Sequence, residues 1–186
     1  MGRNGTGFFL NISKKRTTFG WLFFVIVVVV GRGDKTNIIA AGPFLLIGLF
    51  LRCLAAGTIK KNEVLTTSGP YKFCRHPLYL GSFFIAIGLV IASAHPLTFV
   101  YFIILFPMTY IPAMFSEEKF LQSRFGNAYL DYKNKVPMLL PKVLRINLLE
   151  NFSWRQLLKN EEYLNIVAVF AVIIILLIKA YFVSLK

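Results

Sequence analysis

Long uninterrupted blocks of apolar residues constrain this chain more than any other feature. A soluble domain of 186 residues, 56% of them hydrophobic, has too little interior to bury so much apolar surface. We therefore expect an all-α integral membrane protein with about five transmembrane helices, each of roughly 20 residues. The blocks that predict these helices are Phe19–Val30, Ile38–Ala56, Leu78–Ala94, Leu97–Phe115 and Ile166–Ile178, the last being thirteen apolar residues without interruption.

The first block has two interpretations. Lys14, Lys15 and Arg16 followed by about twelve apolar residues are also typical of a secretory signal peptide. The sequence Gly31-Arg32-Gly33-Asp34 that follows is a poor cleavage site. We therefore expect the block to be retained as a membrane helix, with cleavage as the alternative.

The distribution of positive charge predicts the topology. Segments 1–18, 58–77 and 116–163 hold 16 of the 21 Lys and Arg residues, whereas loops 31–37 and 93–97 hold only Arg32 and Lys35. Cytoplasmic loops of membrane proteins carry an excess of Lys and Arg. We therefore expect a multi-pass protein with a cytoplasmic N-terminus. The net charge of +13 then reflects topology and contact with anionic headgroups rather than nucleic-acid binding.

Cysteine and histidine residues predict neither a disulfide framework nor a metal site. Cys53 falls in the second predicted span and Cys74 in a cytosolic segment, so both are expected to be reduced. His76 and His95 are predicted on opposite sides of the membrane, which excludes a zinc cluster built on both.

The spans predict three parts along the chain. Residues 1–57 form a hairpin of two spans, residues 58–141 carry spans three and four, and residues 142–186 form a basic amphipathic linker and a last span. Spans three and four are antiparallel neighbours, so their cytosolic ends lie side by side. Apolar residues from Phe120 to Tyr132 recur at helical spacing and predict an amphipathic helix after span four, ended by Val136-Pro137 and Leu140-Pro141.

The segment before span three is suited to binding an anion. Gly69-Pro70 predicts a turn, and Pro77 is favourable in the first turn of a helix. That helix start would direct backbone N–H groups and a partial positive charge into the preceding loop. Arg75 and His76 lie beside it, so a ligand carboxylate could be held there.

Two tyrosines frame the same segment. Tyr71 and Tyr79 offer aromatic faces that could pack an adenine or attract a cation. The alternative is structural, because arginine at a membrane boundary commonly snorkels and tyrosine belongs to the aromatic belt.

A pair of carboxylates follows span four. Glu117 and Glu118 lie at its cytosolic end, where charge close to hydrocarbon is costly without a partner or a function. One interpretation is a solvated helix end with Glu118 paired to a nearby lysine. The other places Glu117 opposite Arg75 and His76, where it could hold a ligand amine or a ribose hydroxyl.

These motifs occur in a specific order along residues 63–141. They are Ser68-Gly69-Pro70-Tyr71, Arg75-His76-Pro77-Leu78-Tyr79-Leu80-Gly81, Glu117-Glu118, Phe125-Gly126-Asn127-Ala128-Tyr129-Leu130-Asp131-Tyr132 and Val136-Pro137. The ordered set resembles the isoprenylcysteine carboxyl methyltransferase family, to which the phospholipid N-methyltransferases are related.

The resemblance implies a helical membrane fold with a cytosolic site for S-adenosylmethionine, between the loop before span three and the helix after span four. It assigns catalytic roles to Arg75, as an orienting residue, and to Glu117. It implies no metal. The cofactor-binding residues that it implies are Glu63, Val64, Leu65, Thr66, Tyr71, His76, Pro77, Leu78, Tyr79 and Glu117, the first four through backbone groups.

The methyl acceptor stays open at this stage. In the eukaryotic prenylcysteine enzymes an arginine one turn before the cofactor-binding glutamate helps hold the substrate carboxylate, and here that position is Ala113. We expect a lipophilic or lipid substrate that enters from the membrane. A carboxylate is already ionised at neutral pH, whereas a phospholipid amine must lose a proton, to Glu117, His76 or a tyrosine.

Two other functions are compatible with parts of the pattern. Membrane sterol- or enone-type reductases that use NADPH have a similar Arg-His-Pro and Glu-Glu arrangement, but with further basic motifs for the dinucleotide that are missing here. A non-catalytic membrane scaffold would use the motifs only as a helix hairpin with an aromatic belt. The Gly-x-Gly-x-x-Gly loop of a Rossmann site is absent from the sequence.

Overall fold

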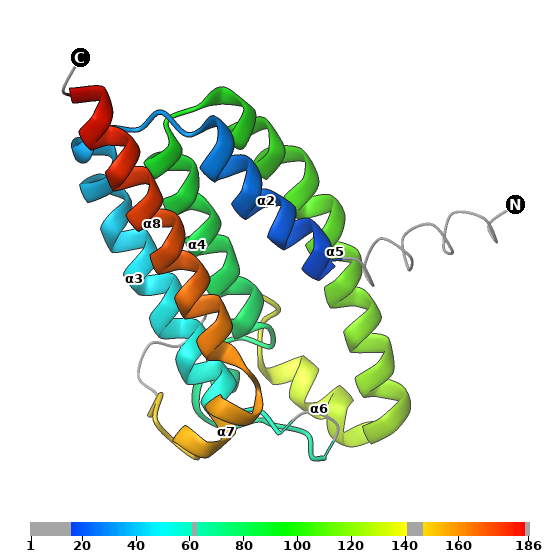
Figure 1. Ribbon diagram of the computed structural model, residues 1–186. Helices are drawn as coiled ribbons and strands as arrows, with labels where there is room; N and C mark the ends of the chain where they lie inside the picture. Colours follow the sequence, from blue (N-terminus) through cyan, green and yellow to red (C-terminus); the bar gives the residue numbers. More distant parts are fainter. Residues whose placement is uncertain (1–15, 61–62, 141–146, 185–186) are drawn as a thin grey trace, which may run out of the picture. The chain divides into compact units, whose positions relative to one another are not determined.

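The computed structural model describes residues 16–60, 63–140 and 147–184, with the side chains of Arg16 and Thr17 excepted. Lys14 and Lys15 of the signal-peptide interpretation, and the predicted helix-ending Pro141, lie outside the described residues. Within them, every regular element is helical (Figure 1), which confirms the all-α prediction. The elements are α2 (Arg16–Val30), α3 (Lys35–Thr58), the 3-10 turn η1 (Gly69–Lys72), α4 (Pro77–Ser93), α5 (Pro96–Phe125), α6 (Asn127–Lys135), α7 (Trp154–Lys159) and α8 (Glu162–Ser184).

Each predicted apolar block forms one helix, and the protein is an all-α integral membrane protein. Among the described residues, α3, α5 and α8 are long and apolar enough to cross a membrane by length and composition. The other two, Thr18–Val30 and Pro77–Ser93, are shorter apolar helices. At about 1.5 Å per residue, a helix of 17 residues spans roughly 26 Å, slightly less than the ~30 Å hydrocarbon core.

Two helices extend beyond their apolar blocks. Helix α8 begins at Glu162, before the uninterrupted block, and α5 continues past Phe115 to Phe125. The amphipathic helix predicted around Phe120–Tyr132 is present, but Gly126 divides it into the end of α5 and all of α6. Gly126 has a φ of 54°, a conformation that side chains other than glycine rarely adopt.

The packing divides the chain into two compact units. Unit 1 comprises residues 1–45, 86–118 and 168–186, and unit 2 comprises residues 46–85 and 119–167. Helices α3, α4, α5 and α8 each contribute a part to both units. The three sequence parts, 1–57, 58–141 and 142–186, follow chain order rather than packing and stay a prediction.

Unit 1 is held largely by apolar packing between helices. The Phe23 ring of α2 stacks on the Tyr101 ring of α5 at 5.2 Å between centroids, and the Tyr101 hydroxyl donates to the Phe19 carbonyl at 2.7 Å. Lys179 of α8 donates to the carbonyls of Val28 and Val29 at the end of α2, at 2.9 and 3.2 Å. These bonds satisfy carbonyls that the helix itself leaves without partners.

Unit 2 contains a close crossing of α3 and α4. A Cβ added at Gly48 would lie 2.7 Å from the carbonyl oxygen of Gly81 and 2.7 Å from Ile85 Cγ1. Small residues permit such an approach of two helix backbones within a membrane. The crossing sets the start of α4, and therefore the loop before it, against the end of α3.

Candidate active site

The loop before α4 turns sharply at η1. Gly69 has a φ of 55°, and a Cβ there would lie 2.9 Å from the carbonyl oxygen of Glu150 and 3.1 Å from that of Leu148. Only glycine is compatible with both the conformation and the space. Tyr71 follows and is buried, and its carbonyl accepts a hydrogen bond from the Tyr132 hydroxyl of α6 at 2.7 Å.

Arg75 connects this loop to the end of α6 through hydrogen bonds. Its Nη1 donates to the carbonyls of Lys133 at 3.0 Å and Val136 at 2.7 Å, in the last turn of that helix. The adjacent backbone adds two bonds, from Arg75 N to the Pro137 carbonyl at 2.9 Å and from His76 N to the Met138 carbonyl at 3.2 Å. These contacts hold the loop against the end of α6, and the predicted part of Arg75 in catalysis stays a prediction.

The start of α4 brings three predicted cofactor residues together. His76 is 4% exposed, Pro77 is fully buried, and Tyr79 is buried beside them. The rings of His76 and Tyr79 lie 5.4 Å apart at an angle of 57°. The His76 carbonyl accepts from the backbone N–H groups of Tyr79 and Leu80, which closes the first turn. Leu78 is half-buried.

The predicted residues before η1 lie at the surface. Glu63 and Val64 are exposed, whereas Leu65 and Thr66 are half-buried. Glu63 forms an ion pair with Lys159 of α7 at 2.7 Å. The hydrogen bond from Lys159 and its positive charge lower the pKa of the Glu63 carboxyl. This stretch is therefore accessible, and its use in binding a ligand stays a prediction.

The two glutamates of α5 lie in unit 1. Glu117 is half-buried, whereas Glu118 is buried at 4% exposure, so the prediction that Glu118 is solvated is wrong. Its predicted pairing to a nearby lysine stays a prediction. Unit 2 gathers the predicted residues from 63 to 79 by itself. The predicted part of Glu117 in the same site stays a prediction.

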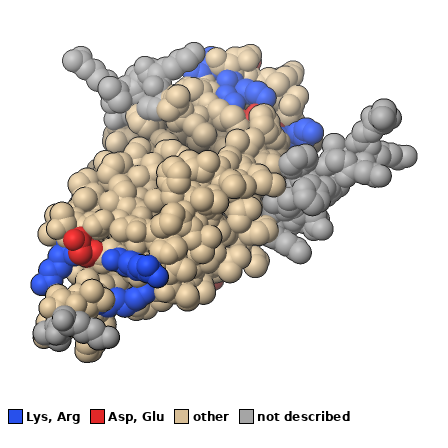
Figure 2. All heavy atoms as spheres, turned by 90° about the horizontal axis from the view of Figure 1, so that it is seen from above, with Lys and Arg blue, Asp and Glu red and all other residues tan. Residues whose placement is uncertain are grey.

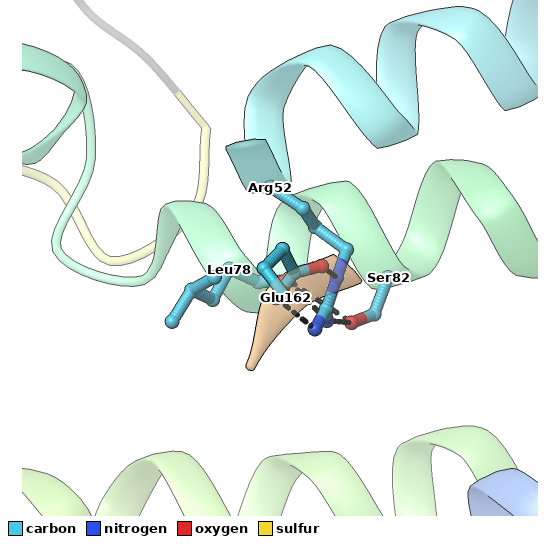
Figure 3. Close-up of polar contacts among 4 residues, drawn as sticks. All are labelled: Arg52, Leu78, Ser82 and Glu162. Atoms are coloured by element: carbon cyan, nitrogen blue, oxygen red, sulfur yellow. Dashed lines mark hydrogen bonds and ion pairs between the residues drawn. The ribbon is translucent and has the colours of Figure 1, made fainter. Parts of the chain in front are cut away.

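A buried ion pair in unit 2 was not anticipated from the sequence (Figure 3). Arg52 of α3 donates from Nε to Glu162 Oε1 at 2.6 Å and from Nη2 to Glu162 Oε2 at 2.9 Å. Its Nη1 donates to Ser82 Oγ at 2.5 Å and to the Leu78 carbonyl at 3.5 Å, both on α4. The available signal was a lone arginine within the apolar block 38–56, since charges inside a membrane segment are nearly always paired.

Cys74 lies in the core beneath the loop. It is 0% exposed and packs with Leu51 and Leu80. Burial raises the pKa of its thiol to about 12, against a smaller lowering by a hydrogen bond to the backbone of His76. A thiol with so high a pKa is almost entirely protonated at neutral pH and is a poor nucleophile. Cys74 is therefore structural.

A cavity of about 640 Å³ lies in unit 1, between the loop after α2 and the end of α8. Arg32, His95 and Lys179 are among the residues that line it. None of the predicted site residues lines this cavity. Figure 2 shows that uncharged residues cover most of one face of the molecule and that Lys and Arg stand there in small groups.

The fold and the loop before α4 define a class of helical membrane proteins, and comparison with known proteins identifies the family. The chain belongs to the family described as phospholipid methyltransferase, which matches residues 36–128, half of the chain. The matched segment runs from α3 to the start of α6 and contains the whole loop before α4.

Individual relatives match over a similar length. The protein-S-isoprenylcysteine O-methyltransferase of Saccharomyces cerevisiae is 38% identical over 82 residues, which are 44% of this chain and 34% of that protein. The mouse protein of the same name is 39% identical over 80 residues, 43% of this chain and 28% of that protein. A cobalt-zinc-cadmium resistance protein of Cupriavidus metallidurans is 31% identical over 84 residues, 45% of this chain and 38% of that protein.

The matched segments therefore span about a third of the length of these relatives. No solved structure gives a significant match to this chain.

Proposed function

We propose that this protein is an S-adenosylmethionine-dependent methyltransferase that acts on a lipophilic acceptor at the membrane. The observation that carries the proposal is that the family match over residues 36–128 contains the loop and first turn of α4, where Tyr71, His76 and Tyr79 are buried together. The names of the relatives support the same reaction class, since two of them are O-methyltransferases.

The residues at the start of α4 fit the polar and aromatic parts of this cofactor. The partial positive charge at the start of this 17-residue helix favours a carboxylate. The rings of His76 and Tyr79 provide aromatic surface beside it. When bound, S-adenosylmethionine supplies a methyl group on a sulfonium. We assign the binding of this cofactor to Tyr71, His76, Pro77, Leu78, Tyr79 and the backbone of residues 63–66. We add Glu117 on the strength of the family resemblance.

The protein's own contribution is orientation and exclusion of water. Methyl transfer needs the acceptor in line with the leaving sulfur, and a rigid site achieves this by holding both partners in one geometry. The bonds from Arg75 to the carbonyls of Lys133 and Val136 fix the loop, which supports a positioning role. If the acceptor is an amine, His76 or Glu117 would take its proton.

We infer a carboxylate of the isoprenylcysteine type as the acceptor, because two of the relatives bear that name. The family description favours a phospholipid amine as the second candidate. Ala113, buried on α5, supplies no cation for a substrate carboxylate, so a carboxylate acceptor would need another donor. We further propose that the N-terminus and the site face the cytoplasm, which the positive charge of segments 58–77 and 116–163 supports.

Ligand-dependent thermal stabilisation of the purified protein in detergent tests the cofactor. S-adenosylhomocysteine should raise the melting temperature in a concentration-dependent manner, whereas NADPH should not, because only a ligand bound to the folded state stabilises it. His76→Ala and Glu117→Ala should weaken the stabilisation. His95→Ala, which changes a histidine of unit 1, is the matched control and should respond as the wild type does. Stabilisation by NADPH alone would overturn the proposal in favour of a reductase.

The acceptor is tested by incubating membranes that contain the protein with a methyl-labelled cofactor. A carboxyl methyl ester releases labelled methanol in mild base, whereas an N-methyl group does not. Base-labile label in a lipid-modified acceptor supports the isoprenylcysteine assignment. Base-stable label in the phospholipid fraction would assign the amine instead.

A further inference from the structure

The described residues from 147 to 162 follow the segment that matches the family, yet they contact both α3 and the candidate cofactor loop. The family match ends at residue 128. Segment 147–162 includes α7 and the first residue of α8 and lies entirely in unit 2. We propose that this segment fixes the cofactor loop, with Arg52 and Glu162 as the positioning pair at the start of α4. The inference rests on the proposed function; Glu162 lies outside the family match, whereas Arg52 lies within it.

The segment first covers the end of α3. Ser153 N donates to the Gly57 carbonyl at 2.9 Å, and Asn160 Nδ2 donates to the carbonyls of Ala56 and Ile59 at 2.8 and 3.0 Å. Phe152 packs so closely on Gly57 that an added Cβ would lie 2.2 Å from its ring. Carbonyls at a helix end need outside partners, and this segment provides them.

The segment then holds both sides of the loop. Lys159 pairs with Glu63 at 2.7 Å, and Glu150 pairs with Lys72 at 2.7 Å. Its carbonyls at Leu148 and Glu150 lie against Gly69, where any side chain would collide with them. The loop between residues 63 and 72 is therefore contacted at its start and across its turn.

Glu162 connects the segment to the start of α4 through Arg52. The pair is buried, with side-chain exposures of 4% for Glu162 and 17% for Arg52. Arg52 extends past Gly81 of α4, since a Cβ at Gly81 would lie 2.5 Å from Arg52 Cγ. Its Nη1 reaches Ser82 Oγ and the carbonyl of Leu78, a predicted cofactor residue (Figure 3).

The charge of the pair explains why it can position a helix. A buried ion is strongly destabilised without its partner, so Arg52 and Glu162 keep one mutual geometry. Because Arg52 also donates from its third nitrogen, Nη1, to α4, that geometry also sets the turn that contains Pro77 and Leu78. Loss of the pair should therefore affect ligand binding at this turn and not only stability.

The test measures S-adenosylhomocysteine affinity by calorimetry in the full-length protein. Glu162→Gln keeps the shape of the side chain but removes its charge, and Ser82→Ala removes one contact of Arg52. Both should raise the dissociation constant, Glu162→Gln by about tenfold, as expected for loss of a charge-assisted bond, and Ser82→Ala by less. Lys179→Met is the control, because it removes hydrogen bonds from the other end of α8 and should lower the melting temperature without changing affinity.

A second readout does not depend on the cofactor. Cys74 is fully buried under the loop, so maleimide should label it slowly in the wild type and at least about tenfold faster in Glu162→Gln, because release of the loop exposes the thiol and lowers its pKa. Peptide mass mapping separates this label from any on Cys53.

The two readouts separate the inference from the proposed function. A wild type that does not bind S-adenosylhomocysteine, with faster Cys74 labelling in the variants, would overturn the function and support the positioning role. Unchanged affinity and unchanged labelling in folded Glu162→Gln and Ser82→Ala would overturn the positioning role. If Glu162→Gln does not fold, Ser82→Ala alone decides.

Discussion

The two compact units are stabilised by different kinds of interaction, although four helices contribute to both. In unit 1, helix contacts are mainly apolar. The polar ones include bonds to backbone carbonyls, from Tyr101 to Phe19 and from Lys179 to Val28, and one between the hydroxyls of Ser93 and Thr98. In unit 2, a buried ion pair, Arg52 with Glu162, acts together with backbone bonds that hold an irregular loop. A regular helix satisfies its own backbone groups, whereas a loop beside a membrane depends on side chains and neighbouring segments to do so.

This difference between the units bears on the proposed site. Apolar packing in a membrane fixes helices with little specificity, because lipid is as apolar as the helix surface. Directional bonds and buried charge fix individual side chains. The described predicted residues from 63 to 79 all lie in unit 2, where such bonds are dense. Matched substitutions in the two units test whether they are stabilised by different interactions.

Removing the buried ion pair should have the largest effect. Arg52→Met leaves the Glu162 carboxylate buried without its partner and should cost about 3–5 kcal/mol of stability, whereas Arg52→Met with Glu162→Met should recover much of it. Lys179→Met in unit 1 loses only hydrogen bonds to carbonyls and should cost about 1 kcal/mol. Unfolding in mixed detergent micelles with rising SDS measures all three. An equal loss in Arg52→Met and Lys179→Met would remove the distinction between the units.

Two glycines of the same helix α3 provide the next test. Gly48→Ala places a Cβ within 2.7 Å of Gly81 O and of Ile85 Cγ1 and should cost about 1–3 kcal/mol through overpacking. Gly42→Ala, in unit 1, meets nothing within 4 Å and should be neutral or stabilising by up to about 1 kcal/mol through helix propensity. Thermal unfolding of both variants checks the opposite signs. A destabilising Gly42→Ala would show that helix α3 is equally close-packed along its length.

A matched pair of tyrosines should give a smaller difference. Tyr132→Phe and Tyr101→Phe each remove a 2.7 Å bond from a hydroxyl to a backbone carbonyl, that of Tyr71 and that of Phe19. Each should cost about 0.5–1.5 kcal/mol. Only Tyr132→Phe should also weaken S-adenosylhomocysteine binding, because its partner lies in the candidate loop. Equal affinity in both variants, measured by calorimetry, would argue that the loop does not need this bond.

The surface ion pair should have the smallest effect on stability. Glu63 and Lys159 are both exposed, and exposed pairs are screened by water and salt. Lys159→Ala should leave the melting temperature unchanged within error at physiological salt. It should also bring the pKa of Glu63 back toward its usual value, which carbon-detected NMR of the labelled carboxyl can follow. A clear loss of stability would mean that this pair acts with the buried one rather than as a surface contact.

The sequence predicted the elements that one-dimensional patterns specify. Apolar blocks gave the positions of α2, α3, α4, α5 and α8, because burial in lipid requires a continuous apolar run in each span. The motif between Gly69 and Gly81 indicated the loop and helix start in unit 2. The side-chain partners within this motif could not be predicted from the sequence, as the bonds from Arg75 to the carbonyls of Lys133 and Val136 illustrate.

Tertiary structure alone decided which distant residues share a contact. Arg52 and Glu162 are 110 residues apart, and neither carries a local signal that names its partner. A charge near a membrane segment must be neutralised, which sequence reasoning can state, but the partner depends on which helices pack together and in what rotation. The sequence by itself therefore determined a helical membrane protein with a methyltransferase-like loop. The packing of the start of α8 against α3 in unit 2 decided which residue pairs with Arg52, because pairing of buried charges depends on three-dimensional distance and not on spacing along the chain.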